Sequence, residues 1–513
     1  MKRLRRLPII LAPLLVAGCS VGPDYVTPTA PMPTGNFKEF GGTWEPAKPS
    51  DDAIRGKWWE IYHDPELNAL EEKVNISNQN VIEAEAQFRE AAAAVKVARA
   101  AYYPTVTADP AYTFSQQSQN VGSSRGGAGG SSFGGGGGGG KGPQHVGALA
   151  LSLYDLPIEG SYMVDIWGSV RRNVEEQSAT AEASFANLEN MRLSFQATLA
   201  QDYFELHGQD AEADLLTRSV KSFEDFLTLT KNRYNSGIAS QGDVALAQTQ
   251  LDTTRAQLID LGVARAQFEH AIAVLTGQPP SDFALKEVVL KGTPPHVPVG
   301  VPSKLLQRRP DVAEAERQVA SANAAIGVQV AGYFPQLTLT AQTGLEATEL
   351  SQLATGPSFL WSVGAALAQT VFDAGATHGR VQEAQANYDA TVANYRQTVL
   401  TAMQQVEDDL AGLRILESEA AAEDIAVKSA NVSLDVSTNQ YKAGIVDYLT
   451  VITAQTTALS DEVQAVNIRT RRMTTSVLLV EALGGGWTSA TLPGVAGVAD
   501  VPQSQQQIDK GKK

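Results

Sequence analysis

The residues of this sequence whose types could carry out chemistry have a spacing that predicts no catalytic site. Three consecutive acids, Glu407, Asp408 and Asp409, could hold a metal ion or act as a general acid and base. Leu410 and Leu413 stand beside them, so the pattern favours a solvated or lumen-facing surface of a long helix instead. The six histidines are scattered, and no pair has metal-ligand spacing. We therefore expect neither an enzyme nor a bound metal ion or cofactor.

Cys19 is the one residue whose chemistry the sequence does predict. Four basic residues among the first six precede an apolar stretch, Leu7 to Val16, which is too short to span a bilayer. Small residues then lead to Cys19, and the segment resembles a bacterial lipobox, which implies cleavage after residue 18 and a covalent lipid on the cysteine. The alternative is an ordinary signal peptide with an incidental cysteine. Ser20 favours export to the outer membrane, as in lipoproteins generally, and a single cysteine excludes disulfides.

The charge balance excludes one class of partner. The formal net charge is −16, and loss of residues 1–18 would remove four positive charges and no negative ones. Nucleic-acid binding needs a basic surface to offset the repulsion of phosphates. We therefore expect no nucleic-acid partner.

The sequence contains an internal duplication at two fixed offsets. Tyr102 and Pro104 recur 231 positions later, whereas from Gly168 onward the offset is 207, so that Tyr234 matches Tyr441. An ungapped register over about a hundred residues predicts long regular elements, because loops drift in length. The first copy is 24 residues longer, and the excess falls at the Gly-rich run 121–142. We expect that run to be a disordered extracellular loop.

These periodicities divide the chain into six parts. Helical pattern without proline runs from Gly168 to Gly237 and from Gly375 to Gly444, and a second helical stretch follows each glycine turn. We expect two long helical hairpins, with an extended coiled coil as the alternative. The expected parts are a signal peptide 1–18, an extended Pro-rich arm 19–57, a first repeat 58–278 with hairpin 168–277, a linker 279–302, a second repeat 303–487 with hairpin 375–484, and a disordered tail 488–513.

Four segments alternate polar and apolar residues as β-strands do. In the clearest of them, Leu337, Leu339 and Ala341 alternate with Thr338 and Thr340. No run of 18 or more apolar residues follows the signal segment, so insertion into a membrane would have to use strands. A closed membrane barrel needs at least about eight strands. Several copies of the chain would therefore have to assemble around a common conduit.

Short motifs at the ends of these elements carry a family resemblance. They are the two Tyr-x-x-Gly-Ile turns and the segments Leu305 to Asp311, Tyr333 to Pro335, Phe372 to Gly375 and Ala482 to Trp487. Together they resemble the outer-membrane factors of tripartite efflux pumps, of the TolC and OprM type, and more narrowly the NodT-type lipoprotein branch. The resemblance covers about Trp58 to Trp487. It implies a mainly α fold with a transmembrane β part, in which a homotrimer forms a 12-stranded outer-membrane β-barrel, four strands per protomer, joined to a periplasmic α-barrel.

The resemblance also implies partners and cargo. The partners would be a periplasmic adaptor protein, an inner-membrane pump of the resistance-nodulation-division (RND) type, and the lipid of the outer membrane. The cargo would be small molecules such as drugs or toxic compounds. By resemblance, the adaptor contacts lie in the two glycine turns, at Asn235, Ser236, Gly237, Ile238, Lys442, Ala443, Gly444 and Ile445.

The resemblance places the pore gate just above the second turn. An apolar ring matches Leu449, and positions that carry acids in TolC match Thr450 and Thr453. A ring of threonines cannot bind cations as carboxylates do, so we expect a pore that is less sensitive to cations. Asp447 and Asp243 either take over that role or are N-terminal helix acids that interact with the helix dipole. The candidate gate residues are Tyr441, Asp447, Leu449, Thr450, Thr453 and, from the first copy, Asp243.

Two other classes of function remain open. The same fold could form the outer-membrane conduit of type I protein secretion or of another ABC-type export system. The long helices alone would also suit a non-channel periplasmic coiled-coil lipoprotein. The expected location is the outer membrane, with a lipid anchor and with the helices extending into the periplasm.

Overall fold

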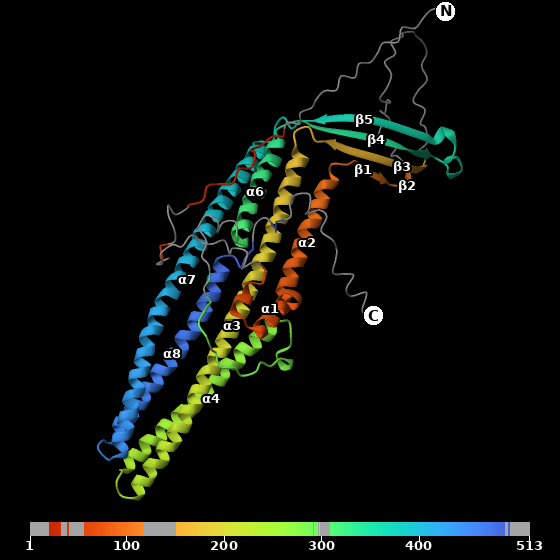
Figure 1. Cartoon of the computed structure of the whole chain (residues 1–513). Coiled ribbons are helices and arrows are strands. Elements are labelled where there is room, and N and C mark those ends of the chain that lie inside the picture. Colours follow the sequence, from red (N-terminus) through yellow and green to blue (C-terminus); the bar gives the residue numbers. More distant parts are fainter. Residues whose placement is uncertain are drawn as a thin grey trace, which may run out of the picture. The chain divides into compact units, whose positions relative to one another are not determined.

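Helices make up most of the described part of the chain (Figure 1). The computed structural model describes residues 20–31, 38–39, 56–116, 150–290, 292–295, 297, 308–487 and 491–492. Outside the described residues lie the predicted signal peptide 1–18, the predicted lipid site Cys19, the Gly-rich run 121–142 and most of the tail 488–513. The chain divides into two units, of which the first contains residues 97–174 and 326–382 together with the chain up to Pro23, and the second contains the rest.

The long helices repeat in length as well as in sequence. α3 (Ser169–Asn235) and α7 (Ala376–Lys442) have 67 residues each, and α4 (Gln241–Leu275) and α8 (Tyr448–Ala482) have 35 each. At about 1.5 Å per residue, α3 and α7 are each about 100 Å long. The pairs α3–α4 and α7–α8 form two helical hairpins at the places where the periodicity predicts them (Figure 1). Among the described residues, no helix is both long and apolar enough to cross a membrane.

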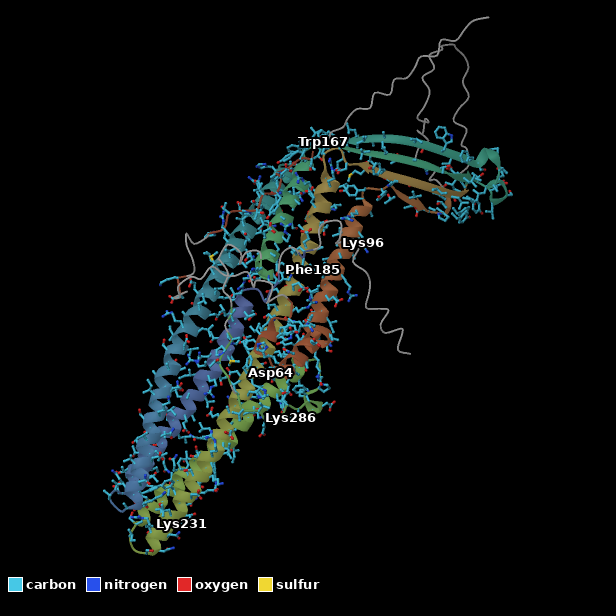
Figure 2. The ribbon with its side chains drawn as sticks, viewed as in Figure 1. Asp64, Lys96, Trp167, Phe185, Lys231 and Lys286 are labelled. Carbon is cyan, nitrogen blue, oxygen red and sulfur yellow. The ribbon has the colours of Figure 1, made fainter. Side chains whose placement is uncertain are left out.

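Shorter helices precede the strands in each copy. They are η2 (Trp58–Tyr62), α1 (Pro65–Ser77) and α2 (Gln79–Ala100) in the first copy and α6 (Pro310–Ala331) in the second. Asp64 begins α1 by accepting hydrogen bonds from the N–H groups of Glu66 (2.9 Å) and Leu67 (3.2 Å), which satisfies donors that the first turn leaves free. Phe185 of α3, labelled in Figure 2, packs edge-on against Phe88 of α2, with ring centroids 5.2 Å apart.

The strands form one antiparallel sheet in the first unit. They are β1 (Thr105–Ala108), β2 (Ala111–Gln116), β3 (Ala150–Val164), β4 (Gln336–Ala347) and β5 (Phe359–Ala368). β1 and β2 both pair with β3, and β4 and β5 follow in order. Alternation predicts one strand where β1 and β2 stand, but Asp109-Pro110 divides it, because proline has no N–H to give to the ladder. The sheet therefore has four strand positions. Two short turns, η4 (Leu350–Gln352) and η5 (Gly356–Ser358), connect β4 to β5.

One face of the sheet is more apolar than the other. On β4, Leu339 lies opposite Tyr162 of β3 and Ala365 of β5. On the other face, Gln342 donates a side-chain hydrogen bond to Glu159 (3.1 Å). The apolar face of β5 carries large exposed side chains, at Phe359, Trp361, Val363 and Leu367. This face has no cover within the described part of the chain.

The second unit has a hydrophobic core to which both copies contribute. Trp58, Leu67, Leu199, Val399 and Val477 are buried in it and come from η2, α1, α3, α7 and α8. Since helices of the two copies share this core, neither hairpin can bury its apolar face without the other.

A junction at the end of α4 holds the first hairpin against α1. The side chain of Asn78 donates to the carbonyl oxygen of Leu275, 2.9 Å away. Gly277, with a φ of +69°, lies so close to Ser77 that a Cβ atom there would be 2.3 Å from the Ser77 carbonyl oxygen. Only glycine fits both the conformation and the space.

The same junction recurs at the end of α8. Arg309, 231 residues after Asn78, donates to the carbonyl oxygen of Ala482 (3.0 Å), and Ala482 lies 207 residues after Leu275. Gly484 (φ +91°) approaches Arg308 so closely that a Cβ would lie 2.0 Å from its carbonyl oxygen. Two segments that carried the family resemblance, around Arg309 and around Gly484, therefore contact each other.

The described part of the predicted linker 279–302 lies along α3 and α4. It begins with a short turn, η3 (Pro280–Asp282). Arg265 then donates to the carbonyl oxygen of Leu285 (2.9 Å), and Asp210 accepts from the N–H of Val288 (3.0 Å). Arg265 and Asp210 also pair with each other at 2.7 Å. The buried pair thus fixes the linker backbone.

Candidate gate and adaptor site

Both hairpins turn through the same backbone geometry. Gly237 (φ +74°) ends α3, and the N–H of Ile238 reaches back to the carbonyl oxygen of Arg233 (2.9 Å). Gly444 (φ +78°) ends α7, and Ile445 bonds to Gln440 in the same way (2.9 Å). This is the glycine-terminated helix end in which a left-handed residue satisfies the last carbonyls.

The residues predicted to contact an adaptor are all exposed at these turns. Residues 235–238 and 442–445 are exposed throughout. Ile238 is 66% and Ile445 is 72% exposed. Each tip therefore presents one large apolar side chain to solvent.

The two predicted gate acids both serve as helix caps. Ser240 and Asp243 form a reciprocal capping box at the start of α4 (3.1 and 2.9 Å). At the start of α8, Asp447 accepts from the N–H (3.1 Å) and the hydroxyl (2.8 Å) of Thr450. The hydrogen bond from the Thr450 hydroxyl is the main reason that the pKa of Asp447 is lowered. In their described contacts, both acids fit the alternative of N-terminal helix acids.

Four of the six candidate gate residues share one groove. Asp447, Leu449, Thr450 and Thr453 line a hollow of about 510 Å³ between α8 and α7, where Ala430, Ser433 and Ser437 complete the wall. Leu449 is 57% exposed. The hydroxyl of Thr453 donates to the carbonyl oxygen of Leu449 (2.8 Å), so its proton is engaged within the helix. With Ala454 and Thr457, the lining consists of five hydroxyl side chains, two alanines and the Asp447 carboxylate around a single leucine.

Tyr441 lies inside the protomer. It is 3% exposed and packs beside Tyr448, with ring centroids 5.7 Å apart. Arg233 of α3 stacks over the Tyr441 ring (4.6 Å) and donates to its carbonyl oxygen (3.0 Å). Arg233 thus joins the two hairpin tips. The sequence pattern did not indicate this role, because the matching position in the second copy is Gln440.

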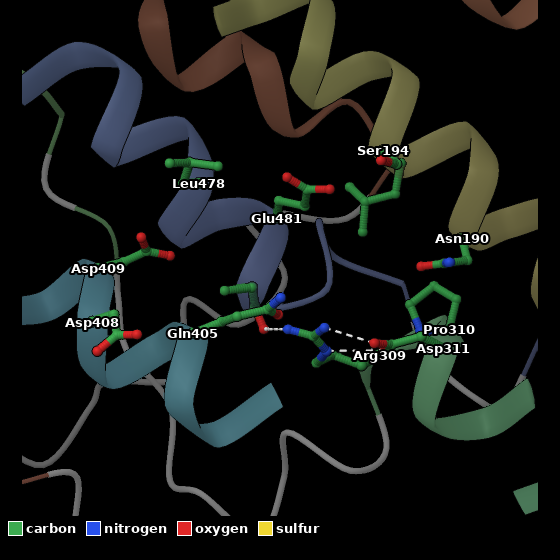
Figure 3. Close-up of a pocket in the computed structure, with 12 residues that line it drawn as sticks. Asn190, Ser194, Arg309, Pro310, Asp311, Gln405, Asp408, Asp409, Leu478 and Glu481 are labelled. Atoms are coloured by element: carbon green, nitrogen blue, oxygen red, sulfur yellow. Dashed lines mark hydrogen bonds and ion pairs between the residues drawn. The ribbon is translucent and has the colours of Figure 1, made fainter. Parts of the chain in front are cut away.

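A second cavity, of about 450 Å³, lies in the second unit, beside the start of α6 (Figure 3). Side chains from α3, the start of α6, α7 and α8 line it, among them Ser194, Asp311, Asp409 and Glu481. Arg309 forks onto Asp311 at 3.0 and 2.6 Å, as the dashed lines in Figure 3 show. The cavity therefore brings four helix segments together around one arginine and several carboxyls.

Two of these carboxyls hold protons more tightly than usual. Burial raises the pKa of Asp409 to about 7, and the carboxylates of Asp408 and Glu481 add to the effect while Arg309 opposes it. Burial also raises the pKa of Glu481, against a hydrogen bond with Ser194. The acids of 407–409 are therefore not a uniform solvated surface, because Asp409 faces the cavity and Glu407 binds the N-terminal arm.

The fold and this site define a class of protein, the outer-membrane efflux channels. The sequence matches the outer membrane efflux protein family over residues 71–278 and 301–485, and the chain belongs to that family. It is a transporter component of the outer membrane and not an enzyme. The resemblance to outer-membrane efflux proteins that the sequence motifs indicate is confirmed.

Relatives extend this match over nearly the whole chain. The toluene efflux pump outer membrane protein TtgC of Pseudomonas putida is 28% identical over 487 residues, which cover 94% of this chain and 96% of TtgC. Nodulation protein T of Rhizobium leguminosarum bv. trifolii is 27% identical over 446 residues, covering 86% and 89%. The solved structure of the outer-membrane channel OprN superposes with a TM-score of 0.81 at 26% identity, covering 91% of this chain and all of OprN.

Proposed function

We propose that three copies of the chain form the exit duct of a tripartite efflux pump, with a 12-stranded β-barrel in the outer membrane and a 12-helix α-barrel in the periplasm. The sheet is the observation that carries this proposal. Among the described strands, β1 with β2 at one edge and β5 at the other have partners on one side only. Unpaired edges are removed when a sheet closes on itself. Three copies of four strand positions give twelve strands, which suffice for a closed barrel.

Strand length and surface support a membrane location for this barrel. β4 has 12 residues, or about 40 Å at 3.4 Å per residue. A strand tilted by about 45° needs about 9–11 residues to cross the hydrocarbon core. The exposed apolar face, with Trp361 and Val363, would then contact lipid, and the face with Gln342 and Glu159 would line the duct.

Lipid on Cys19 would anchor the duct at the same level as the strands. The next residue, Ser20, lies against Gly168, whose Cβ would come within 2.9 Å of the Ser20 Cα. Val21 pairs with Trp167 at the end of the strand region. These contacts support a lipid placed near the base of β3, which ends at Val164.

The hairpin tips would meet a periplasmic adaptor connected to an inner-membrane pump of the RND type. The exposed Ile238 and Ile445 support an apolar contact at each tip. Relatives named for the efflux of toluene and of antibiotics support small apolar or amphiphilic molecules as cargo. Leu449 would form the narrow apolar ring of the closed duct, with Thr450 and Thr453 in place of a carboxylate ring, so that cations would affect the closed pore little.

The proposal is tested by drug accumulation in a strain that lacks the gene. We expect the deletion to raise intracellular dye and drug levels, the wild-type gene to restore efflux, and Ile445→Asp to fail although it folds and reaches the outer membrane. Thr456→Asp, at an exposed position of α8 away from the turn, is the control and should restore efflux. If the deletion instead abolishes the secretion of a protein and leaves drug levels unchanged, the ABC-type secretion alternative holds. No change in either would leave the non-channel lipoprotein.

A further inference from the structure

The N-terminal arm begins in a fitted seat in the first unit. The N–H of Val21 donates to the carbonyl oxygen of Trp167 (3.0 Å), and Arg172 donates to the carbonyl oxygen of Val21 (3.2 Å). Gly22 has a φ of +95°, and a Cβ there would lie 2.5 Å from the Cα of Gly327. The backbone here is hydrogen-bonded on both sides and packs against a glycine of α6. This part of the arm is therefore bound and is not a flexible tether.

The arm is next held in the second unit by a charged group on α6 and α3. The hydroxyl of Tyr25 donates to the carboxylate of Glu316. Arg317 binds both oxygens of Glu316, reaches Glu182 of α3 (3.1 Å) and lies over the Tyr25 ring at 5.7 Å. Burial, followed by the bond to Glu316, raises the pKa of Tyr25, so the hydroxyl remains a donor at all physiological pH values.

The arm then binds α7. The carboxylate of Glu407 accepts two successive backbone N–H groups, from Lys38 (2.6 Å) and Glu39 (2.9 Å). The side chain of Glu39 forms an ion pair with Arg414 of the same helix. A carboxylate that caps two adjacent amides recognises the backbone, and its bonds are stronger than those between neutral groups.

Three residues of α7 form one track for the arm. Arg396 donates to the carbonyl oxygen of Thr29 (3.1 Å), and Glu407 and Arg414 follow 11 and 18 residues later. At about 100° per residue these three side chains point within about 20° of one direction. The track is about 27 Å long at 1.5 Å per residue, and the ten residues from Thr29 to Glu39 span at most about 35 Å when extended. The arm is therefore long enough to reach all three side chains.

We propose that the arm after Cys19 is a strap that holds residues 396–414 of α7 in place and confines movement of the hairpin to the part of α7 nearer the turn. In the described part of the chain, no hydrogen bond or ion pair joins the arm to α7 beyond Arg414. The gate groove begins at Ala430, on the unrestrained side. The strap does not depend on transport activity or on the lipid of the proposed function. A lipid on Cys19 would, however, fix the first end of the strap in the membrane.

Limited trypsin digestion of the purified full-length protein tests whether the strap is docked. Trypsin cleaves after Lys38, whose neighbouring amides are held by Glu407. We expect Glu407→Ala to raise the rate of that cleavage about tenfold, because the rate follows the population of the open arm. The control is Glu417→Ala, an exposed acid ten residues further along α7 whose side chain is not seen to contact the arm in the described structure. An unchanged rate in Glu407→Ala overturns the proposal.

Hydrogen exchange on the same proteins tests whether the strap restrains α7. In Glu407→Ala we expect faster exchange in peptides from 396–414 and unchanged exchange in peptides from 430–442. Equal exchange in both proteins, or faster exchange along the whole helix, overturns the restraint. A second variant, Gly22→Ala, disturbs the seat without touching α7 and should also expose Lys38. Neither readout depends on efflux, so failure of the strap and failure of the proposed duct are distinguishable.

Discussion

Leu449 is the only large apolar side chain among the residues that line the groove near the second turn, and the hydroxyls around it cannot repel each other as carboxylates would. If it narrows the closed duct, Leu449→Ala should raise the closed-state conductance in planar bilayers about twofold or more. The smaller side chains leave a wider constriction, which dewets less readily. Leu246→Ala, on an exposed position of α4 (41% exposed), is the matched control. A closed-state conductance equal to that of the wild type would contradict the assignment.

Gln455, also on α8, has a buried amide that costs free energy of folding. It is 3% exposed, and neither of its amide atoms has a protein hydrogen-bond partner. Val451 and Ala458, on the same helix face, are buried as well. An unpartnered buried amide costs about 1–3 kcal/mol. We therefore expect Gln455→Leu to stabilise the protein by about 1 kcal/mol, seen as a higher thermal midpoint at a fixed heating rate. Gln464→Leu, at an exposed position, should change little; a lower midpoint for Gln455→Leu would show that the amide is needed.

At the scale of elements, the two glycine turns are equal in backbone and unequal in surroundings. Nothing lies within 4 Å of a Cβ at Gly237, and only Arg233, at 3.8 Å, lies near one at Gly444. Glycine is therefore required there by its positive φ and not by space. Both turns end helices that share the small tip cluster of Phe223, Leu227, Tyr441 and Val451. We therefore expect strain at a turn to destabilise this tip cluster and to leave the rest of the hairpin unchanged.

Gly444→Ala tests this. A non-glycine residue in the left-handed region costs about 1 kcal/mol. We expect hydrogen exchange to quicken around the second turn and adaptor binding to weaken, while the upper helices keep their protection. Gly262→Ala, inside α4 with open space around it, is the control and should be neutral or slightly stabilising. Loss of protection throughout α7 would instead show that the tip nucleates the whole hairpin.

The cavity between α3, α6, α7 and α8 predicts a dependence on pH. Asp409 binds its proton with a pKa of about 7 in the folded protein, against 3.8 ordinarily. Between about pH 4 and pH 7, the folded state therefore holds a proton that the unfolded state has released. The contribution of this group to the free energy of unfolding is greatest below about pH 4 and falls as the pH rises to 7. Asp409→Asn should raise the free energy of unfolding at pH 8 by about 1 kcal/mol once partial exposure to water is allowed for, seen as a higher thermal midpoint, and should have little effect at pH 4.5. Asp424→Asn, at an exposed position of α7 outside the cavity lining, is the control; an equal gain at both pH values would rule out titration of Asp409.

At the scale of the whole molecule, the proposed assembly in a membrane would cover the exposed apolar face of the sheet and its two open edges. Val363, near the middle of β5, is 76% exposed on this face, and its neighbour Ser362 points to the opposite one. Val363→Arg should reduce the yield of SDS-resistant trimers from the outer-membrane fraction, because arginine at the bilayer midplane costs about 2–4 kcal/mol. Ser362→Arg should assemble normally. Equal yields would mean that this face does not contact lipid.

Much of the fold was predictable because its information is local. The offsets of 207 and 231 residues, the glycine turns and the absence of proline predict the two hairpins, and the structure has helices of 67 and 35 residues in each copy. Alternation predicts four strand positions, and only the break at Pro110 was missed. The roles of Asp243 and Asp447 as helix acids also follow from neighbours three residues away.

Contacts between distant segments could not be predicted in this way. The meeting of Asp409 with Glu481, of Arg233 with Tyr441, and of Glu407 with the amides of the arm joins residues 72 to 369 positions apart. Periodicity describes one element at a time, and it indicates neither which face of a helix receives a partner nor which acid is taken out of water. The sequence by itself determined the repeat, the helices, the strands and the resemblance to efflux channels. Only the tertiary structure decided which charges are paired and that the proline-rich arm is bound to α7, because pairing and burial depend on how faces that are remote in the chain come together.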